Sequence, residues 1–374
     1  MFDRAAFVPE PTPEAVLGMV SSLASDRAPS AVVVLMAAAR AADIGDFVNA
    51  LGASPVPVVG GMFPGLIHDS QLLWHGALAL AIDAPSRRVV IRDFACPRPT
   101  LESVTRSLVF AADTARSHTA LVFIDGFAGP NAGAFLEMLH GHFHAGVEAI
   151  GGGAGFGDFV RAPCLFTENE LLPVGAGIAL RIDRVTSVCV AHGWQKMAGP
   201  FFATETAGGR VLSLDWVPAI DVYERVLAEV GRRPDLGSRF FETAKHFPLA
   251  IVKLGGELIV RDPFALDSEG GLLTLGDVPK HSIVVVLNSD PDRLIAAAES
   301  AAKTAAAGVN DPSRAFVADC VSRSDALKAR FGEELRRVRE AVGVPVSGAL
   351  TIGEIASSGD LIEMHNKTIV VGVA

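Results

Sequence analysis

Short apolar runs rich in β-branched residues alternate with segments of helical periodicity along the chain. The runs 31–36, 120–124 and 315–319 predict buried strands, and each is followed by a predicted helix and a further apolar run. Such strand–helix–strand passages pair their strands in parallel. The pattern therefore predicts an α/β (α+β mixed) fold in which mixed β-sheets are flanked by helices.

Turn residues between other apolar runs predict hairpins, which pair their strands antiparallel. Helices are expected to cover one face of each sheet. The bare faces of two such units could then pack together as a helix–sheet–sheet–helix sandwich. The expected hairpins are 76–83 with 88–94, 174–182 with 185–190, and 204–212 folded at Gly208-Gly209.

The three strand–helix–strand passages also resemble one another in length. The alanines that begin their first strands precede a glycine-rich stretch by 29, 31 and 33 residues. These stretches, at 60–65, 151–155 and 348–353, predict internal repeats that are each closed by a glycine-rich loop. Glycine there permits a positive φ or the close approach of a ligand to backbone N–H groups, so tight turns and ligand contact both stay open. The alternative to repetition is convergence, because short βα units commonly look alike.

Length and composition limit the class of protein. A chain of 374 residues favours two domains, and with half of its residues apolar and only 20% charged it predicts a globular protein with a large core. The net charge of −10 gives no electrostatic reason to expect nucleic acid or an anionic membrane as a partner. Four scattered cysteines without a Cys-x-x-Cys pair fit a reducing compartment. We therefore expect a cytoplasmic protein with no nucleic-acid or membrane partner.

Short motifs occur in a definite order along nearly the whole chain. The first group is Gly60-Gly61, Gly65-Leu66-Ile67, Phe123-Ile124-Asp125-Gly126 and Gly151-Gly152-Gly153-Ala154-Gly155. The second group is Gly193-Trp194, Thr204-Glu205-Thr206, the segment 214–219 with Tyr223, Gly353-Glu354-Ile355 and His365-Asn366-Lys367-Thr368. With this ordered set the chain resembles the FIST family, a sensory domain of signal transduction proteins. The resemblance implies a FIST N-terminal-like domain over residues 1–195 and a FIST C-terminal-like domain over residues 196–374.

The resemblance implies a stand-alone sensory protein that binds a small ligand, with amino acids proposed for the family. Its signal would pass to a separate protein such as a kinase or a cyclic-dinucleotide enzyme. Because some relatives bind haem and sense nitric oxide, a haem-binding nitric-oxide sensor is one alternative. An uncharacterised hydrolase or transferase that uses Asp125 or Glu354 is another. One departure concerns the stretch 62–67, which lacks the hydroxyl residues and glutamate that the family carries there and that this chain has at 351–355.

The candidate ligand-binding residues lie in or beside these motifs. Asp125 ends an apolar strand and Glu354 follows a glycine, so either carboxylate is a candidate partner for an amino group, with a turn or N-cap role as the alternative. His192 and His365 are candidates for a polar cavity wall, or for axial ligands if haem is bound, and structural histidines are the simpler interpretation. No nucleophile with its base and no metal-ligand spacing is present, so no catalytic or metal residue is predicted. The predicted ligand-binding set is Asp125, Gly126, Gly151, Gly152, Gly153, His192, Trp194, Thr204, Glu205, Gly353, Glu354, His365 and Asn366.

Overall fold

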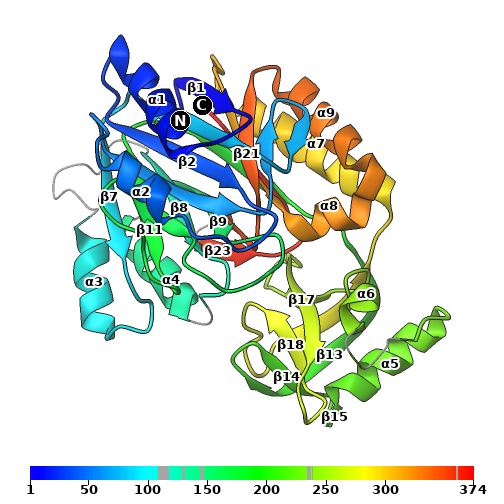
Figure 1. The fold of residues 1–374 in the computed structure, drawn as a ribbon. Helices are drawn as coiled ribbons and strands as arrows, with labels where there is room; N and C mark the ends of the chain where they lie inside the picture. The colour runs from blue at the N-terminus through cyan, green and yellow to red at the C-terminus, as the bar shows by residue number, and fades with distance from the viewer. Residues whose placement is uncertain (108–117, 129–130, 144–146, 234–236, 238, 359–360) are drawn as a thin grey trace.

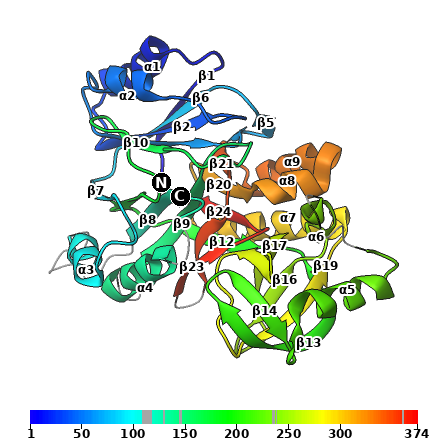
Figure 2. The ribbon, with the colours of Figure 1, turned by 60° about the horizontal axis from the view of Figure 1, so that its bottom comes forward.

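The computed structural model describes residues 1–107, 118–128, 131–143, 147–233, 237, 239–358 and 361–374 of the chain. A larger body contains three mixed sheets with helices on their outer faces, and a small barrel lies beside it (Figure 1, Figure 2). This arrangement confirms the predicted mixed α/β fold class. None of the helices in these ranges has both the length and the apolar composition that crossing a membrane requires.

The sheets and helices have the following bounds. The first sheet has the order β1 (Arg4–Val8), β6 (Ala77–Ile82), β2 (Ala31–Ala37), β3 (Val58–Phe63) and β10 (Leu165–Thr167). The second has the order β23 (Leu361–His365), β22 (Glu354–Ser358), β9 (Val147–Ala154), β8 (His118–Asp125), β11 (Gly177–Ile182) and β7 (Ser86–Ile91). The third has the order β12 (Ser187–Ala191), β24 (Ile369–Val373), β20 (Ala315–Cys320), β21 (Val346–Thr351), β4 (Leu66–His68) and β5 (Gln71–Leu73).

The barrel has the order β13 (Gln195–Ala207), β19 (Ile283–Asn288), β16 (Leu249–Val252), β17 (Leu258–Leu266), β18 (Leu272–Leu275), β14 (Arg210–Leu214) and β15 (Val217–Pro218), and β13 also pairs with β14. The helices are α1 (Pro13–Ser25), α2 (Gly45–Leu51), α3 (Arg98–Arg106), α4 (Asn131–Phe143), α5 (Ala219–Glu229), α6 (Phe240–Ala244), α7 (Pro291–Ala307), α8 (Val321–Leu327) and α9 (Phe331–Val342). A single 3₁₀ turn, η1 (Lys328–Arg330), joins α8 to α9.

The three sheets of the body share one internal order. A parallel pair lies at the centre of each, namely β2–β3, β8–β9 and β20–β21. An antiparallel strand, β6, β11 or β24, lies beside the first member of each pair. This order is the structural counterpart of the three similar passages in the sequence, while descent from a repeated ancestor stays a prediction.

The strand beside the second member of each pair comes from a different passage. β4 directly follows β3 in the chain and yet pairs with β21 in the third sheet. β22 directly follows β21 and yet pairs with β9, while β10 follows β9 and pairs with β3. Each passage therefore gives a strand to another passage, and the three sheets form a closed, interlocked cycle.

Two of the three predicted hairpins are wrong for the same reason. β6 and β7 belong to different sheets, since β6 pairs with β1 and β2 while β7 pairs with β11. β11 and β12 are also in different sheets, because β12 pairs with β24. A short polar turn changes the direction of the chain equally well within a sheet and between two sheets, so the turn residues could not separate these cases. The third hairpin, β13–β14 around Gly208-Gly209, is confirmed.

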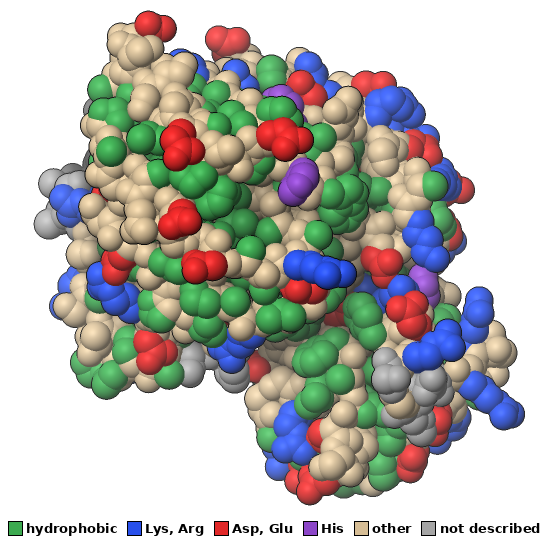
Figure 3. Space-filling model, viewed as in Figure 1, with side chains coloured by type: hydrophobic (Ala, Val, Ile, Leu, Met, Phe, Trp, Pro, Cys, Tyr) green, Lys and Arg blue, Asp and Glu red, His purple; other side chains and the backbone are tan. Residues whose placement is uncertain are grey.

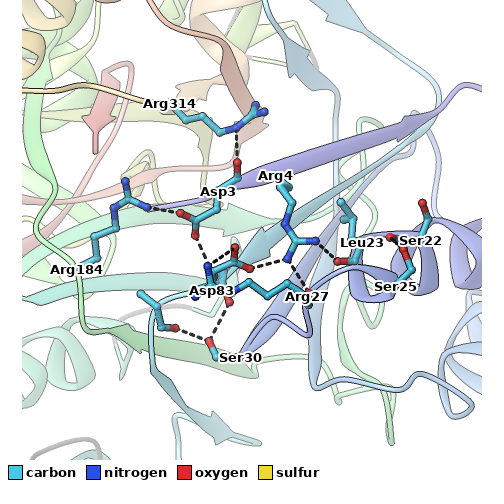
Figure 4. Close-up of polar contacts among 12 residues, drawn as sticks. Asp3, Arg4, Ser22, Leu23, Ser25, Arg27, Ser30, Asp83, Arg184 and Arg314 are labelled. Carbon is cyan, nitrogen blue, oxygen red and sulfur yellow. Dashed lines mark hydrogen bonds and ion pairs between the residues drawn. The ribbon is translucent and has the colours of Figure 1, made fainter.

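Polar side chains hold these two crossings between sheets together (Figure 4). The Asp3 carboxylate accepts a hydrogen bond from the backbone N–H of Asp83, at the first crossing, at 2.9 Å. It also pairs with Arg184, at the second crossing, at 2.5 Å. Arg4 Nη2 donates to Asp83 Oδ1 at 2.6 Å, and Arg314 donates to the Asp3 carbonyl oxygen at 3.2 Å. Asp3, the residue that directly precedes β1, thus connects all three sheets.

The central core lies between the inner faces of the three sheets. Phe63 from β3 meets Phe123 from β8 edge-on at 5.3 Å between ring centroids, and Phe123 meets Phe316 from β20 at 6.4 Å. Helices α1 and α2 cover the first sheet, α3 and α4 the second, and α7 and α9 the third (Figure 2). The sequence predicted that two helix-covered sheets would pack face to face as a sandwich. In the structure, three helix-covered sheets pack around one core.

The predicted glycine-rich loops begin too early, because the first glycines of the three stretches lie inside strands while Gly65, Gly155 and Gly353 follow the strand ends. Gly60, Gly151 and Gly348 are paired with Val34, Val122 and Val317 in the parallel centres of the sheets. A Cβ at any of the three glycines would overlap the carbonyl oxygen of its valine partner. Glycine is needed there because the two backbones approach closely. In the sequence alone, a glycine required for this reason cannot be distinguished from a glycine in a loop.

Candidate functional site

Several predicted site residues gather at the ends of the central strands of the second sheet. Asp125 is buried at the end of β8, where its carboxylate accepts hydrogen bonds from the N–H groups of Phe127 at 2.9 Å and Gly175 at 2.7 Å. The Gly126 N–H donates to the Ala154 carbonyl oxygen at 2.9 Å. Asp125 is therefore satisfied by one backbone donor in its own Asx-turn and by a second from the segment that precedes β11.

The predicted glycines are packed against one another in this region. Gly151 and Gly152 pair with Ile355 and Glu354 across the β9–β22 ladder. The Gly153 N–H donates to the Gly353 carbonyl oxygen at 2.8 Å, and Gly353 has a φ of 83°. Side chains at these positions would overlap neighbouring backbone, which gives the glycines a packing role. Their predicted contact with a ligand stays a prediction.

Glu354 lies fully buried beside these glycines. Its carboxylate accepts hydrogen bonds from Thr351 Oγ1 and Thr368 Oγ1, both at 2.8 Å, and from the Thr368 N–H at 3.2 Å. Burial raises the pKa of Glu354 to about 7, although these hydrogen bonds oppose the shift. Its cross-strand partner His365 is also buried, and burial together with the charge of Arg261 lowers the His365 pKa to about 3.

Glu354 is expected to make stability depend on pH. Its pKa is about 7 in the folded protein against an ordinary 4.5, so the folded state holds an extra proton between these values and stability falls as pH rises. This group alone should lower the free energy of unfolding by about 2 kcal/mol between about pH 5 and pH 7. Urea titrations across this range should show a smaller decline in Glu354→Gln, whose amide stays neutral. The exposed Glu229→Gln on α5 is the control, and an undiminished slope in Glu354→Gln would contradict the assignment.

The remaining predicted residues lie in two places. His192 and Trp194 are next to Lys367, whose carbonyl oxygen accepts a hydrogen bond from Trp194 Nε1 at 3.2 Å. His192 Nδ1 accepts from the Trp194 N–H at 2.8 Å, and Asn366 Nδ2 donates to the Leu275 carbonyl oxygen at 2.9 Å. Thr204 and Glu205 are on β13 of the barrel, where Thr204 Oγ1 contacts Ser213 Oγ at 2.6 Å and Glu205 is exposed. The structure does not bring Thr204 and Glu205 to the others.

A buried charged cluster that the sequence did not predict lies next to this region. Arg323 on α8 is fully buried, with Nη2 at 2.5 Å from Glu334 Oε2 and Nε at 3.3 Å from Asp319 Oδ1. Its remaining N–H groups donate to the carbonyl oxygens of His192 at 2.7 Å and Leu294 at 3.0 Å. Burial raises the pKa of Asp319 well above its ordinary value, and the nearby Glu334 carboxylate raises it further. Of the two carboxyl groups, Glu334 therefore makes the closer ion pair with Arg323, at 2.5 Å against 3.3 Å for Asp319.

The fold itself does not require a charge at Asp319. Asp319 stands two residues after Val317, the valine that faces the strand glycine. The equivalent positions in the other two sheets are Met36 and Ile124, both buried and apolar. A buried carboxyl group is unfavourable where an apolar side chain fits, so its presence in the third sheet indicates a functional region. Comparison of the three aligned passages is the sequence signal that could have found it.

A second buried pair connects this cluster to the surface. Lys367 Nζ lies 3.0 Å from Asp262 Oδ2 and donates to the Lys245 carbonyl oxygen at 2.8 Å. The Lys367 ammonium also lies 5.3 Å from the centroid of the Trp194 ring. Ser322 Oγ donates to Asp262 Oδ2 at 3.2 Å, and Ser322 is at the same time part of a cavity wall. The polar network thus extends from the buried charges to a cavity.

This cavity, named here the α8 cavity, has a volume of about 520 Å³. It lies between the body and the barrel near α8 and α6, where the surface is hollowed (Figure 1, Figure 3). The residues that directly follow β3 and β20 contribute to it, which agrees with the tendency of α/β proteins to bind ligands at the carboxyl ends of strands. Its lining is Pro64, Leu72, Trp74, Gly157, Phe159, Phe241, Val321, Ser322, Ser324, Asp325, Lys328, Phe331 and Gly332.

None of the predicted site residues lines the α8 cavity, and Gly126 lines a separate cavity of about 180 Å³. Among the described residues no group of three or more His, Cys, Asp or Glu side chains is arranged to hold a metal ion. The four cysteines are free thiols. The polar residues of α8 were missed because the sequence offers no motif there, only a short helix after an apolar strand.

Comparison with known proteins identifies the family. Residues 28–217 match the FIST N domain and residues 219–357 match the FIST C domain. A search of curated proteins found no match. Among solved structures, the PurLQS structure from Thermotoga maritima matches with 13% identity over 99% of this chain and 72% of that one, at a TM-score of 0.20. T. maritima PurL complexed with ADP matches with 12% identity over 99% and 71%, at a TM-score of 0.21. The chain therefore belongs to the FIST family of sensory and signalling domains, with a FIST N domain followed by a FIST C domain.

Proposed function

We propose that this protein is a cytoplasmic sensor that binds a small ligand in the α8 cavity and signals to a separate protein. The observation that carries the proposal is the position of Ser322, which lines the cavity and also donates to the buried Asp262. The cavity is walled by both FIST domains, with Trp74 from one and Phe241 from the other. A ligand there would contact both domains and the buried network behind them.

The cavity wall suits an amino acid. Aromatic side chains on several sides, among them Phe159 and Phe331, offer apolar surface for a side chain. Lys328 and Asp325 carry opposite charges at the same cavity, as the two ends of a zwitterion require. Asp325 also pairs with Lys245 at 2.7 Å, whereas Lys328 has no ion-pair partner among the residues that the structure describes. We expect Lys328 to bind the ligand carboxylate.

Helix α8 links the cavity to the buried charges. Ser322 and Asp325 face the cavity, while Arg323 on the same helix is held by Glu334 on α9. A ligand that shifts α8 would therefore act directly on this buried ion pair. Such a change at α8 and α9 would alter the surface offered to a partner such as a kinase or a cyclic-dinucleotide enzyme.

The test is a thermal-shift screen of the twenty amino acids, followed by calorimetry on any that stabilise the protein. Lys328→Ala is expected to weaken binding about tenfold, because a charge-assisted hydrogen bond is lost. Lys303→Ala, an exposed substitution on α7 away from the cavity, is the matched control and should bind as the wild type does. Stabilisation by none of the amino acids, or equal affinities for the two variants, would reject the amino-acid site.

The candidate residues of the two alternatives drawn from the sequence lie outside the α8 cavity. His192 and His365, the candidate haem ligands, line neither the α8 cavity nor the cavities of about 180, 320 and 330 Å³. Asp125 and Glu354, the candidate catalytic carboxylates, line none of them either. Ligand binding at α8 is therefore the function that we propose.

A further inference from the structure

A second cleft separates the body from the barrel, on the side where α4 and β23 lie. Two neighbouring cavities of about 320 and 180 Å³ share Ala132, Gly276, Asp277 and Met364 in their walls, and Arg261 lines the larger of them. One wall comes from α4 of the FIST N domain, and the other from β16 and β17 of the FIST C domain. None of the residues that line this cleft lines the α8 cavity.

Arg261 on β17 points its guanidinium group into this cleft. Its Nε donates to the Asp277 carbonyl oxygen at 2.9 Å, and its Nη1 donates to the carbonyl oxygens of Val260 at 2.9 Å and Met364 at 3.3 Å. No carboxylate among the described residues lies within ion-pair distance of it, since Asp277 offers its carbonyl oxygen instead. Arg261 is half-buried, and its Nη2 group has no hydrogen-bond partner among the described residues.

The surroundings of Arg261 are shaped to hold this guanidinium in place. Gly276 has a φ of 82°, and a Cβ there would lie 3.1 Å from Arg261 Nε and 3.3 Å from Cζ. Glycine thus provides the room for the side chain at a backbone conformation that other residues rarely adopt. Burial lowers the pKa of Arg261 to about 10, so it keeps its charge at neutral pH. A fixed, charged guanidinium with a free N–H edge is the usual partner of a carboxylate.

The rest of the lining limits the kind of carboxylate. Ile251, Ile259 and Ile362 give the cleft an apolar wall. Glu137 and Asp277 add negative charge to the lining, which disfavours ligands with several negative charges. Lys253, the other cation of the lining, is already paired with Glu363. We infer that this cleft is a second ligand site, in which Arg261 binds a small organic monocarboxylate whose apolar chain packs on the isoleucines.

The experiment uses hexanoate as the probe and the full-length chain, with affinities measured by calorimetry. Hexanoate should bind at least tenfold more tightly than 1-hexanol, which has the same chain without the charge. Arg261→Met should weaken hexanoate binding at least tenfold. Glu137→Gln, at an exposed position on α4, should strengthen binding a few-fold because it removes a like charge, while Glu229→Gln on α5 should leave it unchanged.

These outcomes also separate this site from the α8 cavity. Lys328→Ala should leave hexanoate affinity unchanged, whatever it does to amino-acid binding. Loss of hexanoate binding in Lys328→Ala, or equal affinity for hexanoate and hexanol, would overturn the assignment. If Arg261→Met does not fold, as judged by circular dichroism, the hexanol comparison and Glu137→Gln still decide, and an unaltered affinity in Glu137→Gln would count against the cleft.

Discussion

Arg323→Met is expected to lower the free energy of unfolding by about 3–5 kcal/mol, the largest loss we expect from removal of one charge. Glu334 would keep its buried carboxylate without the ion pair at 2.5 Å. The carbonyl oxygens of His192 and Leu294 would also lose their donors. Breaking one side of a buried pair is this costly because the partner's desolvation is no longer offset.

Urea denaturation followed by circular dichroism measures the effect. The matched control is Arg336→Met on the exposed face of α9, where Arg336 pairs with Glu340 in solvent and the change should stay within about 0.5 kcal/mol. A loss in Arg323→Met no larger than in this control would show that the ion pair is not buried as described.

A triple replacement tests why the charges are present. Asp319→Met, Arg323→Met and Glu334→Leu together should recover most of the stability lost in Arg323→Met, because an apolar cluster commonly replaces a buried ion pair without loss. Met36 occupies the position equivalent to Asp319 in the first sheet, which shows that the fold accepts methionine there. If the triple variant is stable but no longer responds to the α8 ligand, the cluster serves signalling and not folding.

The sequence was sufficient for the central strands of the three sheets but not for the way the sheets combine. The apolar runs 31–36, 120–124 and 315–319 fall within β2, β8 and β20, and each heads a parallel pair as predicted. Hydrophobic pattern reports which residues are buried, and that is a local property. The sheet in which β4, β10 or β22 pairs depends on contacts between residues far apart in the chain. The sequence of a turn does not predict these contacts.

The candidate site shows the same limit. Glu354 and His365 were recognised from the family motifs, and both are buried polar residues in the structure. Ser322, Arg323 and Arg261 were not recognised, because no motif marks them and their contacts come from other elements of the fold. Arg261, for example, is positioned by Gly276 and by the Met364 carbonyl oxygen, more than a hundred residues away.

Gly348→Ala is the second large effect that we expect, with a loss of more than about 3 kcal/mol in the free energy of unfolding. The added Cβ would overlap the Val317 carbonyl oxygen in the parallel β20–β21 pair, and backbone in the middle of a sheet cannot move away from it. Gly18→Ala on α1 is the control, because nothing lies within 4 Å of its Cβ position and alanine favours helix by about 0.5–1 kcal/mol.

The interlocked sheets predict where the damage from Gly348→Ala spreads. Gly348 lies between Val317 on β20 and Ile67 on β4, which comes from the FIST N domain. Hydrogen exchange should therefore increase in β4, almost 300 residues away in sequence, as well as in β21. Exchange in β14 of the barrel should stay unchanged, because β14 shares no sheet with β21. Faster hydrogen exchange confined to β20 and β21 would contradict the pairing of β4 with β21, because β4 would then be held independently of the third sheet.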